Sequence, residues 1–144
     1  MPASNYLAKK VVELMKGQTI TGPAKLFLAL CEAEVKKAHT GTTIGTEASE
    51  LTYEGYGRVE LSLAEVEIIE GGGAAADEAL NKLAIAVNKN TNTTGKSVAK
   101  WFAITDASTA GNVLFFGKLA EELNITKALT KIEVEAKKLA VSTE

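Results

Sequence analysis

Cysteine and histidine, the side chains most often used for nucleophilic catalysis and metal binding, each occur once among the 144 residues, as Cys31 and His39. One residue of each kind cannot supply a zinc site, and no Asp-rich segment has the spacing of a calcium loop. Cys31 ends the apolar run 26–31, which predicts a buried, unreactive thiol. His39 lies in a polar segment with no nucleophile pattern beside it, which predicts a solvated side chain. We therefore predict no catalytic residue, no cofactor and no metal.

Carboxylates occur in two groups that offer the acid pair of a glycoside hydrolase, in which two acids flank a cleft and have separated pKa values. The groups are Glu65, Glu67 and Glu70, and Glu121 with Glu122. Acidic residues that alternate with apolar ones are typical of the solvent-facing side of a strand. A small β enzyme with such a pair is the third of three functional hypotheses.

Two glycine-containing segments resemble nucleotide-binding motifs without completing them. Residues 95–97, Gly-Lys-Ser, match the end of a phosphate-binding loop, but Asn90 stands where that motif needs its first glycine. Residues 55–58 begin like a dinucleotide fingerprint, but Glu60 occupies the third glycine position. Both segments precede apolar strand patterns rather than helices, so we interpret the first as a hairpin turn and discard the second.

The overall composition is that of an ordinary globular protein, with 46% apolar and 24% charged residues. Sixteen basic and eighteen acidic side chains give a net charge of −2, without the clustered positive field that phosphate neutralisation needs. No stretch approaches the roughly 18 apolar residues of a membrane span. We expect neither a nucleic-acid nor a membrane partner. The length predicts a single domain, residues 1–144.

The amino-terminal segment, residues 1–17, has the spacing of one short amphipathic helix. Ser4 is a favourable N-cap residue, and Gly17 is typical of a helix end. Apolar side chains recur between them at i, i+4 and i+7, at Leu7, Val11 and Leu14. After a turn, the short apolar run 25–31 predicts a strand covered on both faces, in the centre of a sheet.

Residues 32–57 are rich in Lys, Thr, Gly, Glu and Ser, and predict one long polar loop. A structureless loop of this length in a compact domain is usually functional or hides an unrecognised element. We interpret it as an arm that contacts a partner, with Tyr53 and Tyr56 among its few apolar residues.

The rest of the chain has the alternation of short strands separated by turn residues. The predicted strands are 58–68 with a bulge, 83–87 paired with 98–105, 113–119 joined to 98–105 by a hairpin, 123–126, 130–136 and 139–141. The Ala-rich residues 74–80 predict a helical turn or a flexible crossing. Aromatic residues of the hairpin predict cross-strand core contacts: Trp101, Phe102, Phe115 and Phe116. The pattern predicts a mainly β fold, an antiparallel β-sandwich or jelly-roll-like domain with a short amino-terminal α-helix and one long polar loop.

Several blocks in the chain together resemble a known family. They are residues 4–7, 23–30, 45–49, 56–58, 101–107 and 111–119, of which the last reads Gly-Asn-Val-Leu-Phe-Phe-Gly-Lys-Leu. This ordered set resembles a family of small virion proteins of tailed bacteriophages, commonly labelled tail-fibre proteins. The resemblance implies a particle component made in the cytoplasm of the bacterial host, in the tail or on the head.

The first hypothesis is therefore a non-enzymatic structural subunit on the surface of a tailed-phage virion, of tail-fibre or capsid-decoration type. It would act as a homo-oligomer and contact neighbouring capsid or tail subunits. The second, from another class, is a carbohydrate-binding module for host-surface glycans, with Tyr53, Tyr56 or Trp101 stacking on sugars. The residues that we predict to contact partners are Tyr6, Leu7, Val11, Leu14, Tyr53, Tyr56 and Arg58.

Overall fold

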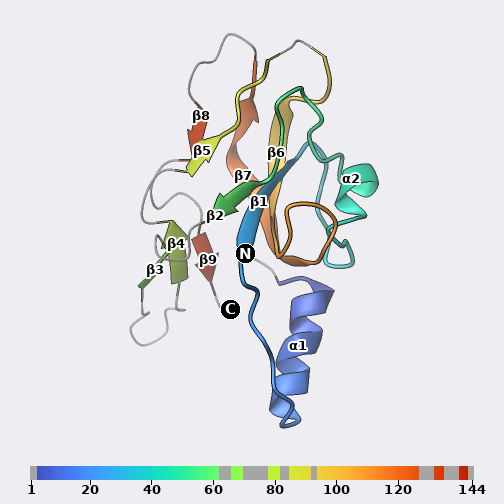
Figure 1. The fold of residues 1–144 in the computed structure, drawn as a ribbon, viewed down its shortest axis with the longest axis vertical. Helices are drawn as coiled ribbons and strands as arrows, with labels where there is room; N and C mark the ends of the chain where they lie inside the picture. The colour runs from blue at the N-terminus through green and yellow to red at the C-terminus, as the bar shows by residue number, and fades with distance from the viewer. Residues whose placement is uncertain are drawn as a thin grey trace.

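A four-stranded antiparallel sheet forms the centre of the protein. The computed structural model describes residues 3–61, 66–69, 78–81, 85–91, 94–126, 132–134 and 140–142. The strand order is β2-β1-β6-β7, with β1 Leu26–Cys31, β2 Val59–Leu61, β6 Val98–Thr105 and β7 Val113–Asn124. Two small sheets accompany it (Figure 1): β3 Val66–Ile69, β4 Glu78–Asn81 and β9 Ala140–Ser142 form one, and β5 Ile85–Val87 pairs with β8 Ile132–Val134.

Strand β1 is interior in the sheet and buried on both faces, as its continuous apolar sequence predicts. Leu28 and Leu30 belong to one core cluster with Phe102, while Ala29 and Cys31 belong to a second cluster. Successive side chains of a strand point to opposite faces, so the two clusters lie on opposite sides of the sheet. The sheet therefore needs cover on both faces.

The predicted hairpin between β6 and β7 is confirmed, with Phe102 opposite Gly117. In the turn, the Asp106 carboxylate accepts hydrogen bonds from the backbone N–H of Asn112 at 2.7 Å and from its side-chain amide at 2.9 Å. Of the four predicted aromatic residues, two are buried, Phe102 and Phe116, and two are partly buried, Trp101 and Phe115. All four pack against the core clusters as predicted.

The amino-terminal helix is also confirmed, as α1 Asn5–Met15. The buried Ser4 hydroxyl accepts a hydrogen bond from the Leu7 N–H at 3.2 Å and donates one to the backbone carbonyl of Val113 in β7. Gly17 ends the helix with a φ of 83°, which a residue with a Cβ adopts only at a cost. Figure 1 shows that α1 extends away from the sheet beyond this attachment. No helix in the described ranges is long and apolar enough to cross a membrane.

The segment 32–57 is not a wholly polar loop. It contains a short helix, α2 Ile44–Glu47, and its apolar residues Val35, Ile44, Ala48, Leu51 and Tyr53 are all buried. Three of them belong to the cluster on the Cys31 face of the sheet: Val35, Ile44 and Ala48. Ile44, Ala48 and Leu51 do have the i, i+4, i+7 spacing of a helix face, a signal that the sequence analysis missed among the surrounding Thr, Gly and Glu residues.

Several predicted strand assignments are wrong in detail. Residues 58–68 contribute to two strands of different sheets, β2 and β3, instead of one bulged strand. β5 pairs with β8 and not with β6, whose partners are β1 and β7. Residues 78–80, expected in a helical turn or a crossing, belong to β4, and β7 extends to Asn124 so that 123–126 is no separate strand. Residues 74–77, Glu65 and Glu70 lie outside the described residues.

The mainly β class and the antiparallel pairing are confirmed. β8 lies within the predicted segment 130–136, and β9 overlaps the predicted segment 139–141 but ends one residue later. The sheet β2-β1-β6-β7 is open, because its edge strands do not pair with each other among the described residues. The sandwich or jelly-roll arrangement is not shown by these three sheets.

The Ser4 hydroxyl should stabilise the protein through both of its hydrogen bonds. Ser4→Ala removes the helix cap and leaves a buried carbonyl without this donor, so we expect the free energy of unfolding to fall by about 1–3 kcal/mol in urea titrations. The exposed Thr21→Ala serves as control and should change it by less than about 0.5 kcal/mol. Equal stabilities of the two variants would contradict this role.

Candidate interaction site

The Arg58 guanidinium joins segment 32–57 to the turn between β6 and β7. Its Nε and Nη2 donate to the two oxygens of Glu50, at 2.9 and 3.0 Å. Its other N–H groups reach the backbone carbonyl oxygens of Gly41, Ala107 and Ala110, at 2.6, 3.1 and 2.9 Å. The Arg58 side chain is 4% exposed. This buried cation is thus paired with a carboxylate and surrounded by acceptors, the condition under which a charge is tolerated inside a protein.

Glu50 and Tyr56 extend this network to the central strand. The Tyr56 hydroxyl donates to Glu50 Oε2 at 2.6 Å and accepts from the Leu30 N–H at 3.2 Å. Burial, followed by the charge and hydrogen bond of Glu50, raises the pKa of Tyr56. Burial alone would lower the pKa of Arg58, but the hydrogen bonds and charge of Glu50 raise it overall. Tyr56 therefore stays a neutral donor and Arg58 a cation at all physiological pH values.

Gly41 is needed where this network crosses the turn after β6. Its N–H donates to the Gly111 carbonyl at 3.0 Å, and a Cβ added at Gly41 would lie 1.8 Å from the carbonyl oxygen of Ala110. Only glycine permits so close an approach of the two backbones. The carbonyls of Gly41 and Ala110 consequently converge on the Arg58 guanidinium.

An open groove of about 400 Å³ lies beside this network. It is lined by residues 41, 42, 45, 50–52, 56–58 and 108–110. The surface of the groove is mainly apolar, and four of the residues that line it carry hydroxyl groups: Thr42, Thr52, Ser108 and Thr109. Because all N–H groups of Arg58 donate within the chain, its guanidinium has no free N–H group to offer to a ligand in the groove. In the described part of the chain, no group of three His, Cys, Asp or Glu side chains could hold a metal ion.

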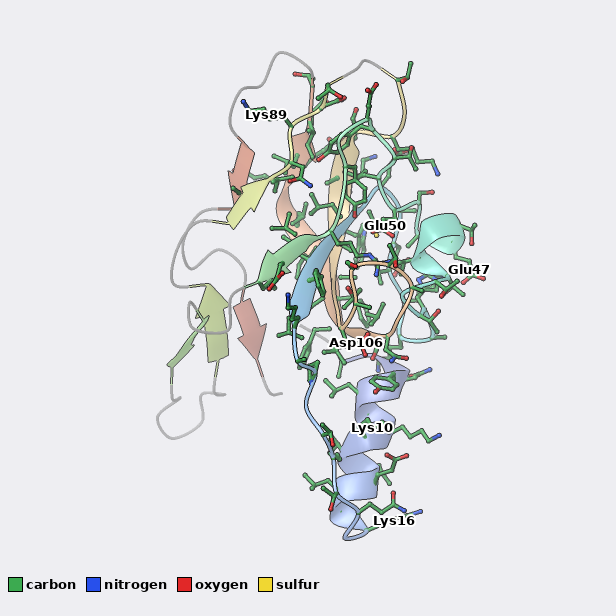
Figure 2. The ribbon with its side chains drawn as sticks, in the orientation of Figure 1. Lys10, Lys16, Glu47, Glu50, Lys89 and Asp106 are labelled. Carbon is green, nitrogen blue, oxygen red and sulfur yellow. The ribbon has the colours of Figure 1, made fainter. Side chains whose placement is uncertain are left out.

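Three of the predicted partner-contact residues lie inside the protein's own structure. Tyr53 is 2% exposed, and its hydroxyl donates to the Asn88 carbonyl at 2.7 Å. Tyr56 is half-buried and its ring meets that of Tyr53 edge-on, with 5.5 Å between centroids. Arg58 is held as described above. Burial and hydrogen bonding within the chain occupy these three side chains, and a role in partner contacts stays a prediction for them. Figure 2 shows Glu50 in the interior of the molecule, toward α2.

The four other predicted contact residues lie on α1, where no residue is fully buried. Tyr6 and Leu7, at the attached end, are half-buried. Val11 and Leu14 are 49% and 58% exposed. The sequence analysis missed two further apolar side chains of this helix, Val12 and Met15, which are 50% and 82% exposed. They fall outside the i, i+4, i+7 series, so the spacing alone did not select them.

The prediction for the single histidine is wrong, and the prediction for the single cysteine is confirmed. His39 is 8% exposed and not solvated as predicted: its Nδ1 accepts from the Lys36 N–H at 3.1 Å, and its Nε2 lies 3.3 Å from a Glu47 oxygen. These two contacts of His39 fix the loop before α2.

Cys31 is fully buried as predicted, and burial, with a smaller contribution from the Glu50 charge, raises its pKa from 9.0 to about 12. A thiol in this state is a poor nucleophile.

Glu50 was not singled out by the sequence, although it organises the site. The sequence offers only the opposite charge of Arg58, eight residues later, as a signal that Glu50 forms an ion pair. A separation of eight residues does not bring two side chains together in a strand, and here they meet because the chain turns at Tyr53–Tyr56.

The ion pair can be tested against an exposed one in the same protein. Arg58→Met leaves Glu50 buried without its cation, and we expect the free energy of unfolding to fall by about 3–5 kcal/mol. Adding Glu50→Gln to that variant should recover part of the loss, because the uncompensated charge disappears. Lys25→Met breaks only the exposed pair with Glu60 and should cost less than about 1 kcal/mol. Similar losses for Lys25→Met and Arg58→Met would contradict the role of the network.

Alkaline pH should destabilise the fold through its buried acidic groups. Burial raises the pKa of Tyr53, like that of Cys31, to about 12. The folded state binds these protons more tightly than the unfolded chain, so this stabilisation is complete below about pH 9 and declines as the pH rises toward 12. Urea unfolding between about pH 8 and 10.5 should show the decline. Cys31→Ala should show a smaller one, and an identical pH profile in that variant would exclude a contribution from the thiol.

Comparison with known proteins places the chain in a family. A comparison with curated proteins gives no match. The model of the Gp80 family, described as podophage GP4 fiber I protein gp80, matches residues 2–142. This match spans nearly the whole chain and agrees with the resemblance carried by its ordered sequence blocks. The chain therefore belongs to the Gp80 family of podophage fibre proteins, which implies a structural role in the virion.

Proposed function

We propose that this protein is a non-enzymatic accessory subunit on the surface of a tailed-phage particle. It acts by associating with copies of itself and by contacting neighbouring capsid or tail proteins. Membership of a fibre protein family supports the structural role, since fibre proteins are generally non-enzymatic. The observation that carries the proposed mode of action is the exposed apolar side of α1.

Helix α1 holds every exposed large apolar side chain found in the described part of the protein: Val11, Val12, Leu14 and Met15. Burying one such side chain is worth about 1.5–3 kcal/mol. Adjacent apolar groups left in water at this density mark a contact surface more often than scattered single residues do. Among the described residues, burial of this helix by a partner would therefore remove the most exposed apolar surface from water.

The attachment of α1 fixes the direction in which this surface points. The Ser4 N–H donates to the Leu114 carbonyl at 2.9 Å, and the Asn5 N–H donates to the Lys37 carbonyl at 2.8 Å. Ala3 also forms a β-bridge with Phe115. The first residues of the helix are thereby tied to β7 and to segment 32–57. A helix held in this way loses little freedom on binding, which favours association.

Point variants test the role of α1 better than removal of residues 1–17, because Ser4 is part of the folded core. Phage carrying Leu14→Asp should assemble particles with little or none of this protein, measured by gels and mass spectrometry of purified virions. Circular dichroism should show that the variant still folds, since Leu14 is exposed. Lys9→Asp changes the opposite side of the helix and should be incorporated normally. Normal incorporation of Leu14→Asp would contradict the proposed mode of action.

The location of the protein in the particle can be determined by separating the heads and tails of wild-type phage. Mass spectrometry should detect it in one fraction: in tails it acts as a fibre subunit, and on heads as a capsid decoration. Its absence from both fractions would contradict a virion role.

Carbohydrate binding is the second candidate, and the groove beside Arg58 is the observation that favours it. Its hydroxyl side chains and the half-buried Tyr56 suit a neutral, hydroxylated ligand such as a sugar. Binding on a glycan array that is abolished by Ser108→Trp, which fills the groove, would support this function. Array silence with an intact fold would exclude it for the glycans displayed. The sandwich fold stays a prediction that accompanies either function.

A further inference from the structure

The single histidine of the chain, His39, is held by contacts that only a neutral imidazole can make. Its side chain is 8% exposed, and both ring nitrogens have partners. Nδ1 accepts a hydrogen bond from the Lys36 N–H at 3.1 Å, so this nitrogen carries no proton. The ring proton is therefore on Nε2, which lies 3.3 Å from a Glu47 oxygen. Histidine is also the residue type whose charge ordinarily changes between about pH 5 and 8.

The turn that His39 holds also anchors the amino-terminal helix. The His39 N–H donates to the Lys36 carbonyl at 3.0 Å, so the ring and the backbone together close this turn. Within the turn, the Lys37 carbonyl accepts a hydrogen bond from the Asn5 N–H at 2.8 Å. Ser4 is attached elsewhere, because its N–H donates to β7. Of these two attachments of α1, only the one at Asn5 depends on the turn of His39.

We propose that protonation of His39 releases the Asn5 attachment, so that mildly acidic pH frees α1 to turn about Ser4, which stays bound to β7. A protonated imidazole has an N–H group at both nitrogens and cannot accept a hydrogen bond at Nδ1. Its new N–H group would point at the Lys36 N–H, which would lose its acceptor. Opening of the turn relieves this contact, and the Lys37 carbonyl moves with the turn. This response of the chain to pH does not depend on the proposed virion role.

Glu47 is the group that opposes the release. Its carboxylate attracts a protonated ring, and this is the only ion pair that His39 forms with a described residue. The Glu47 side chain is 60% exposed, however, so solvent screens the attraction. Against it stand the burial of a charged ring and the loss of an acceptor for the part-buried Lys36 N–H, which both cost free energy. The balance favours opening of the turn over a charged ring inside the closed one.

The other charged groups around the turn do not offset a charge on the ring. The first turn of α1 has no acidic residue. In the neighbouring turn after β6, the Asp106 carboxylate is occupied by hydrogen bonds within its own turn. The Arg58 cation is already paired with a carboxylate. The segment of His39 itself contributes two acidic and two basic side chains before the ring, all on exposed residues: Glu32, Glu34, Lys36 and Lys37.

Amide hydrogen exchange of the full-length protein, followed by NMR at about pH 7.5 and 5.5, tests this proposal. After correction for the intrinsic pH dependence of exchange, protection of the Asn5 N–H should fall by at least about fivefold at the lower pH. The N–H groups of Ser4 and Ile125, which donate to β7 and to the Ser97 carbonyl, should keep their protection. Unchanged protection of Asn5 would overturn the proposal, as would an equal loss at Ile125, which indicates general acid unfolding.

The NMR signals of the imidazole ring connect the response to His39 in the wild-type protein. Because the chain has one histidine, these signals report its protonation directly, and they should change over the same pH range as the protection of Asn5. A response of Asn5 at a pH where the ring does not titrate would overturn the proposal.

Two variants separate protonation of the ring from other acid effects. In His39→Asn the side-chain carbonyl can replace Nδ1 as the acceptor and does not titrate, so the protection of Asn5 should be equal at both pH values. Glu47→Gln removes the opposing charge, and its acid response should be at least as large as that of the wild type. An acid response that persists in His39→Asn, or one that Glu47→Gln abolishes, would assign the effect to another group and overturn the proposal.

Discussion

The buried ion pair between Arg58 and Glu50 determines how the segments around the sheet are held. Removing two charges from water costs several kcal/mol for each ion, and here the cost is offset by a bidentate pair and three carbonyl acceptors. Those carbonyls come from Gly41 and from the turn after β6. One side chain thereby sets the position of two segments that are distant in sequence, and through Tyr56 it reaches the backbone of β1.

This network also helps to hold the segment that covers one face of the four-stranded sheet. The apolar residues of segment 32–57 are few, and alone they would hold an irregular chain against the sheet weakly. Val35, Ile44 and Ala48 bury apolar area on one face, while Glu50 ties the end of α2 to the start of β2. His39 and Glu47 add a contact between the loop and α2. Hydrophobic burial and hydrogen bonding therefore act together on the same segment.

Most of helix α1, unlike segment 32–57, is not held against the rest of the protein. Its first turn is fixed by the capped, buried Ser4, whereas its last two turns carry apolar side chains that remain in water. An element tied at one end and exposed at the other adds little to the stability of its own domain. Under the function proposed above, these apolar side chains contact other chains, in keeping with membership of a fibre protein family. The proposal thus assigns stability and assembly to separate parts of the chain.

The sequence by itself determined the elements whose residues follow a regular period: the capped helix at residues 5–15, the interior strand at 26–31 and the hairpin of β6 and β7. It also indicated the family through its ordered blocks, and the exposed helix residues Val11 and Leu14 as contact candidates. The tertiary structure decided which strands pair, because apolar alternation marks segments such as β5 and β6 as strands but does not specify their partners. It also decided that Tyr53, Tyr56 and Arg58 face inward. No local pattern distinguishes a buried arginine from a solvated one, since the distinction lies in a carboxylate and three carbonyls that only the folded chain brings together.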